Sequence, residues 1–178
     1  MTNPPDHMDR IVVQWRRERP DLDVEPIGSL GRLFRCAHLA DERLAEGIAP
    51  HGLQPGWFDL LAALRRSGRP YELNPTRLME TTMLSSGGMT KRLDRLEEAG
   101  LVERRPDTAD RRGTLVRLTR RGKTVIDKAV ETHARNEERL LAALSEADRR
   151  ALDGLLRTLL AGLERPETPA SVESPRGL

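Results

Sequence analysis

The chain has 178 residues, of which 33% are charged and only 3% aromatic, and its net charge is +2. This length suits one domain with an added oligomerisation element, and the few aromatic residues argue against a β-sandwich. The single cysteine excludes an internal disulfide framework. Because no signal-like or long apolar segment is visible, we expect a soluble, cytoplasmic protein with no membrane partner.

The first predicted elements are helices. Residues 1–7 contain two prolines and are expected to form a disordered terminus. Apolar residues at helical spacing predict a helix over residues 8–18 and a long helix that ends near Pro50. A third helix is predicted to begin after Pro55 and to bury Trp57 together with the leucines that follow it.

The next elements form a helix-turn-helix with two strands attached. Asn74 before Pro75 predicts the N-cap and first position of a short helix. A recognition-type helix is predicted over residues 86–99. Two short strands, 101–105 and 114–118, flank a turn rich in charged residues. This pattern is typical of a winged helix-turn-helix.

Two helices complete the predicted domain. Thr119 is expected to cap a long helix that reaches about residue 143, and Ser145 is expected to open the last one. Residues 164–178 are predicted to be a disordered tail. The last helix carries an apolar stripe of Leu152, Leu155, Leu156, Leu159, Leu160 and Leu163.

That leucine stripe has two interpretations: burial in the chain's own core, or packing against a second copy. We favour a homodimer, because two recognition helices then meet successive major grooves about 34 Å apart. The predicted fold is therefore mainly α with a small β-wing. A single domain spans 8–163, with a DNA-binding lobe at 54–118 and dimerisation helices at 8–53 and 119–163.

Basic residues gather around the predicted recognition helix. Residues 85–123 contain eleven Lys/Arg and six Asp/Glu. On a helical wheel, the side opposite the apolar stripe carries charged residues that include Lys91 and Arg95, which are suited to guanine edges. Hydroxyls at the start of the helix are suited to phosphates. The predicted DNA-binding residues of this segment are Ser85, Ser86, Thr90, Lys91 and Arg95.

The tip of the predicted wing holds Asp110, Arg111 and Arg112. An arginine in this position is suited to the negative potential of the minor groove, and Asp110 is placed to brace a guanidinium. Taken alone, a charged turn or a charged helix face is usually solvated surface. Since the two features are adjacent in the sequence, we predict that both contact double-stranded DNA.

Three short motifs resemble the MarR family of bacterial winged-helix regulators. They are Gly100-Leu101-Val102, Asp110-Arg111-Arg112, and Leu118-Thr119 followed by Gly122. The resemblance extends over residues 8–163. It implies a homodimeric repressor that binds palindromic promoter DNA and releases it when a small anionic or phenolic ligand binds.

A narrower resemblance is to the urate-responsive branch of that family, which has an extra N-terminal helix. It implies a binding site for urate or a related purine made of Trp15, Asp59, Arg66 and Arg92. On the wheel, Asp59 and Arg66 share a face with two alanines, which leaves a recess about 10 Å long for a planar anion. The alternatives are an ion pair of Asp59 within the chain and simple packing of Trp15.

The remaining candidates are weaker. Cys36 is either an oxidation sensor or, as we favour, a structural thiol in or near the core. The histidines have no metal-ligand spacing, and no catalytic motif is visible, so neither a metal, a cofactor nor an enzymatic activity is expected. Besides a ligand-responsive repressor, a helical protein-interaction module without DNA binding stays open as an alternative.

Overall fold

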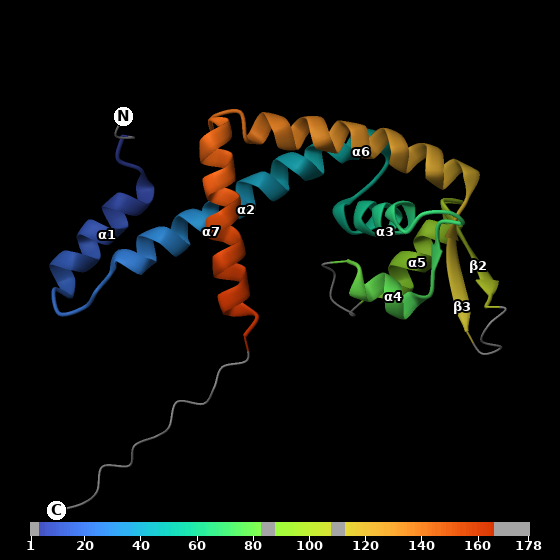
Figure 1. The fold of residues 1–178 in the computed structure, drawn as a ribbon, viewed down its shortest axis with the longest axis horizontal. Coiled ribbons are helices and arrows are strands. Elements are labelled where there is room, and N and C mark those ends of the chain that lie inside the picture. The colour runs from blue at the N-terminus through green and yellow to red at the C-terminus, as the bar shows by residue number, and fades with distance from the viewer. Residues whose placement is uncertain (1–3, 83–87, 108–112, 166–178) are drawn as a thin grey trace, which may run out of the picture. The chain divides into compact units, whose positions relative to one another are not determined.

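The structure is a computed structural model that describes residues 4–82, 88–107 and 113–165 (Figure 1). It divides into two compact units, residues 1–138 and 139–178. As predicted, the chain is mainly helical with one small antiparallel sheet. The helices are α1 (His7–Glu18), α2 (Glu25–Ile48), the short 3-10 helix η1 (Ala49–His51), α3 (Pro55–Arg66), α4 (Pro75–Glu80), α5 (Met89–Glu98), α6 (Arg120–Leu140) and α7 (Glu146–Leu163), and the strands are β1 (Glu72–Leu73), β2 (Val102–Pro106) and β3 (Thr114–Leu118).

The N-terminal helix starts earlier than its apolar spacing predicted. Asp6 is the N-cap of α1 and forms a capping box with Asp9, so Asp6 and His7 do not belong to a disordered terminus. Arg32 of α2 donates to both carboxylates, to Asp6 Oδ2 at 2.7 Å and to Asp9 Oδ1 at 2.5 Å. α1 therefore packs on the first part of α2 through an ion-pair cluster.

α3 is the centre of the predicted DNA-binding lobe. Leu60, Leu61 and Leu64 are fully buried, as the sequence predicted. Ala63, which the sequence placed in an open recess, is only 1% exposed. The prediction was wrong at this residue because α3 is covered on more than one side, by α2 as well as by α4, α5 and β3.

The helix-turn-helix has the caps that the sequence predicted at two of its ends. The Asn74 side chain accepts the N–H of Arg77 and opens α4. At the other end of α5, Gly100 N–H donates to Glu97 and Leu101 N–H donates to Leu96, which is a Schellman motif. The predicted start of α5 at residue 86 was too early. Gly88 is the N-cap with φ at 83°, a left-handed conformation that glycine tolerates and that cannot continue a helix.

The sheet contains one more strand than the sequence predicted, in the order β1-β3-β2. β2 and β3 pair in register, with Arg104 opposite Val116 and Val102 opposite Leu118. The missed strand, β1, pairs Leu73 with Val116 on the other side of β3. A turn with Tyr71 at φ 64° leads into it. Two residues are too few to show a strand periodicity.

α6 begins as predicted at a Thr119 cap. The hydroxyl of Thr119 accepts the N–H of Gly122 at 2.9 Å and donates to the carbonyl of Gly100 at 2.8 Å. A Cβ on Gly122 would lie 1.9 Å from the carbonyl oxygen of Leu101, so this position has no room for a side chain. The glycine of the Leu-Thr-x-x-Gly motif therefore joins α6 closely to the connection between α5 and β2.

α7 is also opened by its predicted cap, since Ser145 Oγ accepts the N–H of Asp148. α6 ends at Leu140, three residues before the predicted end. No residue of α7 is buried. Its leucines range from 38% exposed at Leu152 to 73% exposed at Leu163, so the stripe does not contribute to this chain's core.

Candidate nucleic-acid interface and effector cavity

α5 separates its apolar and polar residues as predicted. Met89, Leu93 and Leu96 are buried, and the exposed side carries three of the predicted DNA-binding residues: Thr90, Lys91 and Arg95. Their DNA contacts remain predictions. The other predicted DNA-binding residues, Ser85, Ser86, Asp110, Arg111 and Arg112, lie outside the described part of the chain.

The structure shows a polar network that sequence reasoning missed. Arg104 of β2 donates from Nη2 to Asp94 Oδ1 and from Nη1 to Glu97 Oε2, each at 2.6 Å. Its backbone N–H also donates to Glu97, at 2.9 Å. The sequence placed Asp94 on the outward side of the recognition helix, and in the structure its carboxylate is held by the wing. The sequence did show a charged residue, Arg104, inside a predicted strand, but it did not indicate which residues Arg104 would contact.

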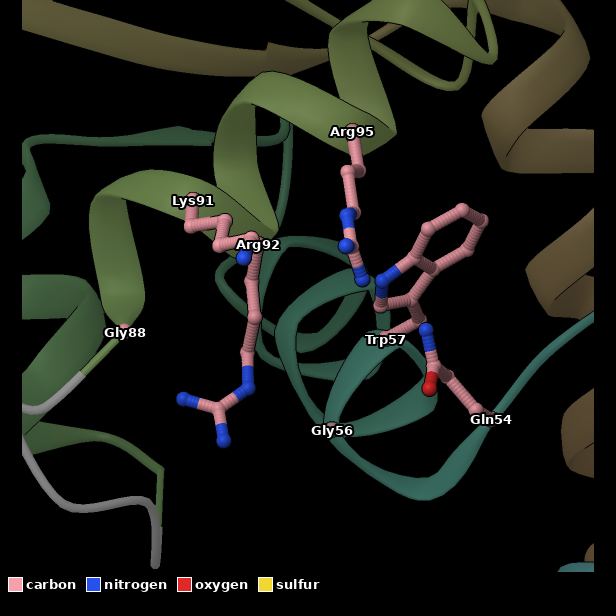
Figure 2. A pocket seen from close by; sticks show the side chains of 7 residues that line it. All are labelled: Gln54, Gly56, Trp57, Gly88, Lys91, Arg92 and Arg95. Carbon is pink, nitrogen blue, oxygen red and sulfur yellow. The ribbon is translucent and has the colours of Figure 1, made fainter.

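A cavity of about 330 Å³ lies between the start of α3 and α5 (Figure 2). Figure 2 shows Arg95 extending from α5 to the indole of Trp57, whereas Arg92 extends past Gly56. Among the described residues, the lining of this cavity has three cationic side chains and no carboxylate. The lining residues are Gln54, Gly56, Trp57, Gly88, Lys91, Arg92 and Arg95.

Arg92 passes close to two glycines that line this cavity, Gly56 and Gly88, and their lack of a side chain leaves it room. A Cβ on Gly56 would lie 3.0 Å from Arg92 Nε, and a Cβ on Gly88 would lie 3.4 Å from Arg92 Nη1. Arg92 is partly buried, in agreement with its predicted position near the inward stripe of α5. Beside it, the Nε1 of Trp57 is buried and has no hydrogen-bond partner in the described part of the chain. The cavity thus offers cationic side chains and the indole of Trp57.

Asp59 and Arg66 lie further along α3. Partial burial raises the pKa of Asp59, the charges of His133 and Arg66 oppose this shift, and the charge of Asp41 adds to it. Arg66 is exposed and donates to the carbonyl of Thr81. Asp59 therefore faces charged residues of α2 and α6, and Arg66 ties α3 to the end of α4.

Trp15 lies apart from these residues within the single chain. Its neighbour Arg16 pairs with Glu25 at the start of α2, whereas Asp59 is close to Asp41 of the same helix. Glu25 and Asp41 are about 24 Å apart along α2 at 1.5 Å per residue. Trp15 is 46% exposed. One copy of the chain therefore does not bring all four predicted effector residues together.

Cys36 is exposed, not in or near the core as the favoured interpretation held. It lines a second cavity, of about 260 Å³, with Arg32, Arg35 and the first residues of α1. Among the described residues, no group of His, Cys, Asp and Glu is arranged to hold a metal ion. Of the helices in the described residues, none has both the length and the apolarity that crossing a bilayer requires.

α3, α4 and α5 pack into one helical core, and α5 has an exposed basic side. The strands β2 and β3 form the wing that follows. These features define a winged helix-turn-helix DNA-binding protein. The profile of the MarR family matches residues 51–113. The HTH-type transcriptional regulator PecS of Dickeya dadantii is 42% identical over 146 residues, which cover 82% of this chain and 88% of PecS. The chain belongs to the MarR family of transcriptional regulators.

Two further comparisons agree with this assignment. The multiple antibiotic resistance protein MarR of Escherichia coli K12 is 30% identical over 133 residues, which cover 74% of this chain and 90% of MarR. A crystal structure of a cysteine-to-serine mutant of MarR from E. coli, complexed with operator DNA, superimposes with a TM-score of 0.67. The two sequences are 28% identical, and the match covers 77% of this chain and 97% of the MarR chain. The family and these relatives are transcriptional regulators and not enzymes, and the same holds for this chain.

Proposed function

We propose that this chain is a ligand-responsive repressor that binds palindromic promoter DNA as a homodimer. It releases the DNA when a small planar anion, such as urate or another purine, binds near Arg92. One observation carries the proposal. The cavity and the predicted DNA-contacting side share a single ten-residue helix, α5, in which Arg92 lies next to Lys91.

The cavity fits an anion of this class. Ligand sites are typically clefts of about 300–1,000 Å³ that combine apolar walls with a few polar groups, and this cavity lies at the lower end of that range. Guanidinium groups bind planar oxyanions through paired N–H donors, and the indole of Trp57 adds an aromatic wall. An anion that draws Arg92 toward itself shifts α5. This releases the DNA provided that the anion binds more tightly to the protein conformation that does not bind DNA.

The dimer is supported by apolar side chains that one copy leaves uncovered. Leu155 and Leu160 of α7 are 70% and 55% exposed, and Phe34 of α2 is 68% exposed. On each of the two helices, large apolar side chains exposed in this way are typical of interaction sites. In this proposal, the effector site extends from the cavity at Arg92 along α3 toward Asp59 and Arg66, and the second copy contributes its Trp15.

Isothermal titration of urate into the protein tests the effector, with Arg92→Ala as the variant. We expect binding heat for the native protein, and loss of most of that heat for Arg92→Ala. Arg117→Ala is the matched control, because Arg117 lies on β3 between two buried residues and so projects from the other face of the sheet. No heat with the native protein, from urate or from related purines, would exclude this effector class.

A gel shift tests the DNA part independently. The probe is a duplex from the region upstream of the chain's own gene, with and without urate. A steep loss of binding as salt rises is expected for phosphate contacts, and urate should lower the bound fraction. If the native protein binds no duplex even at low salt, the protein-interaction alternative replaces the repressor.

A further inference from the structure

The charges of α5 present a problem for a helix that is to approach DNA. α5 carries three Lys/Arg and three Asp/Glu, so its own side chains sum to zero. Asp94 lies one turn after Lys91 on the outward side, and Glu97 lies one turn after Asp94. Unpaired carboxylates in this position would repel the phosphates that Lys91 is expected to meet.

Arg104 reduces that repulsion from outside the helix. Its guanidinium pairs with Asp94 and Glu97 at the same time, and its backbone N–H gives Glu97 a further donor. Arg104 is the most enclosed of the three, since its side chain is 28% exposed, against 49% for Asp94 and 39% for Glu97. Charge-assisted bonds of this kind are among the stronger hydrogen bonds in proteins.

The same contact also fixes the wing on the recognition helix. β2 lies at one edge of the sheet, so its outward N–H groups have no strand partner there. Glu97 accepts one of them, from Arg104, at the last turn of α5. The Schellman turn at Gly100 connects the two elements by a short path. The orientation of β2 against α5 is thereby set by both a chain turn and an ion-pair network.

We infer that Arg104 is a positioning residue for DNA binding. It offsets one of the two negative charges of Asp94 and Glu97, so that α5 together with Arg104 carries a net positive charge, and it holds the wing strand against α5. Arg104 acts through these two carboxylates and not through a DNA contact of its own. The inference rests on the proposed DNA-contacting role of α5.

The decisive experiment compares Arg104→Gln with the triple variant Asp94→Asn, Glu97→Gln, Arg104→Gln. The probe is a duplex of about 30 base pairs, long enough for two successive half-sites. We expect Arg104→Gln to weaken binding on the order of tenfold, because two carboxylates are left unpaired next to phosphate. The triple variant should recover most of the lost DNA affinity, because it lacks both the cation and the two carboxylates.

Two control variants separate charge from geometry. Arg117→Gln removes one cation from the opposite face of the same sheet and should change DNA affinity much less than Arg104→Gln. Arg104→Lys keeps the charge but loses the paired donors of the guanidinium. It should bind DNA more tightly than Arg104→Gln, and it provides the same test if Arg104→Gln does not fold by circular dichroism.

The possible outcomes divide clearly. Native-like binding by Arg104→Gln would overturn the inference, and so would a triple variant as weak as the single one. If Arg104→Lys is no better than Arg104→Gln, charge neutralisation is likewise excluded. Failure of the native protein to bind any duplex would instead count against the proposed function, so the two failures are distinguishable.

Discussion

The lobe around α3 and the last helix, α7, differ in how completely they bury their apolar residues. In the lobe around α3, Leu61, Leu78 and Leu96 are fully buried. In α7 no residue is buried, and Leu163 is 73% exposed. The lobe is thus a closed core that one copy completes, whereas α7 presents an apolar surface that one copy leaves open. A stripe of leucines in the sequence is therefore not by itself evidence of burial within the chain's own core.

The largest expected effect comes from α7. We predict that Leu155→Asp together with Leu159→Asp abolishes the proposed homodimer, because an unpaired charge is costly to bury in an apolar interface. Affinity for a palindromic duplex should fall on the order of a hundredfold, since both half-sites are no longer engaged together. Sedimentation velocity and gel shift measure the two effects.

Ala161→Asp is the matched control for this change, because residue 161 lies on the opposite side of α7 from the leucines. It introduces the same charge and should leave the dimer intact. A double aspartate variant that still sediments as a dimer would mean that α7 is not the interface.

A second change tests the closed core. We predict that Leu61→Ala lowers the free energy of unfolding of the lobe by about 2–5 kcal/mol, because it removes buried atoms and leaves a cavity. Urea unfolding followed by circular dichroism measures the loss. Leu159→Ala on α7 is its counterpart and should weaken the dimer with little effect on the lobe. If both variants changed the stability of the lobe and the strength of the dimer equally, the lobe and α7 would not differ in the way described above.

The smallest expected effect concerns Asp59, which faces both α2 and α6. Its pKa is raised on folding by burial, so its charged form is disfavoured in the folded state. The stability contribution of this group is therefore fully present below its unfolded pKa, near 3.8, and is lost as the pH rises through the folded pKa. We predict that Asp59→Asn raises Tm at neutral pH and that this gain disappears as the pH falls toward 4.

Asp41→Asn provides the control for the charge part of this effect, since Asp41 contributes to the raised pKa of Asp59. In an Asp41→Asn background, the gain from Asp59→Asn should be smaller at neutral pH. A gain that is the same at both pH values would show that packing, and not ionisation, is responsible.

The sequence predicted the elements of the fold well because most of their ends carry local signals. Asn74, Thr119 and Ser145 each cap the helix that they were expected to open. The exceptions lacked a signal that the periodicity of the sequence could show. β1 is too short for periodicity, and the start of α5 is set by the left-handed Gly88.

The candidate site was less predictable for the same reason. A helical wheel assigns one buried side to α3, yet elements far apart in the sequence cover Ala63 as well. Spacing correctly placed Arg92 near the apolar side of α5 but could not show that Trp57 lies beside it. The partners of Arg104 are seven and ten residues away, in another element, and no sequence period links a strand to a preceding helix in this way.

The close approach at Gly122 has a mechanical consequence. With the carbonyl of Leu101 only 1.9 Å from where a Cβ would be, the start of α6 has no freedom to slide against the root of the wing. α6 then extends 21 residues, about 31 Å, from this fixed point. A tilt of α6 by a few degrees about this point moves its distal end by roughly 2–3 Å.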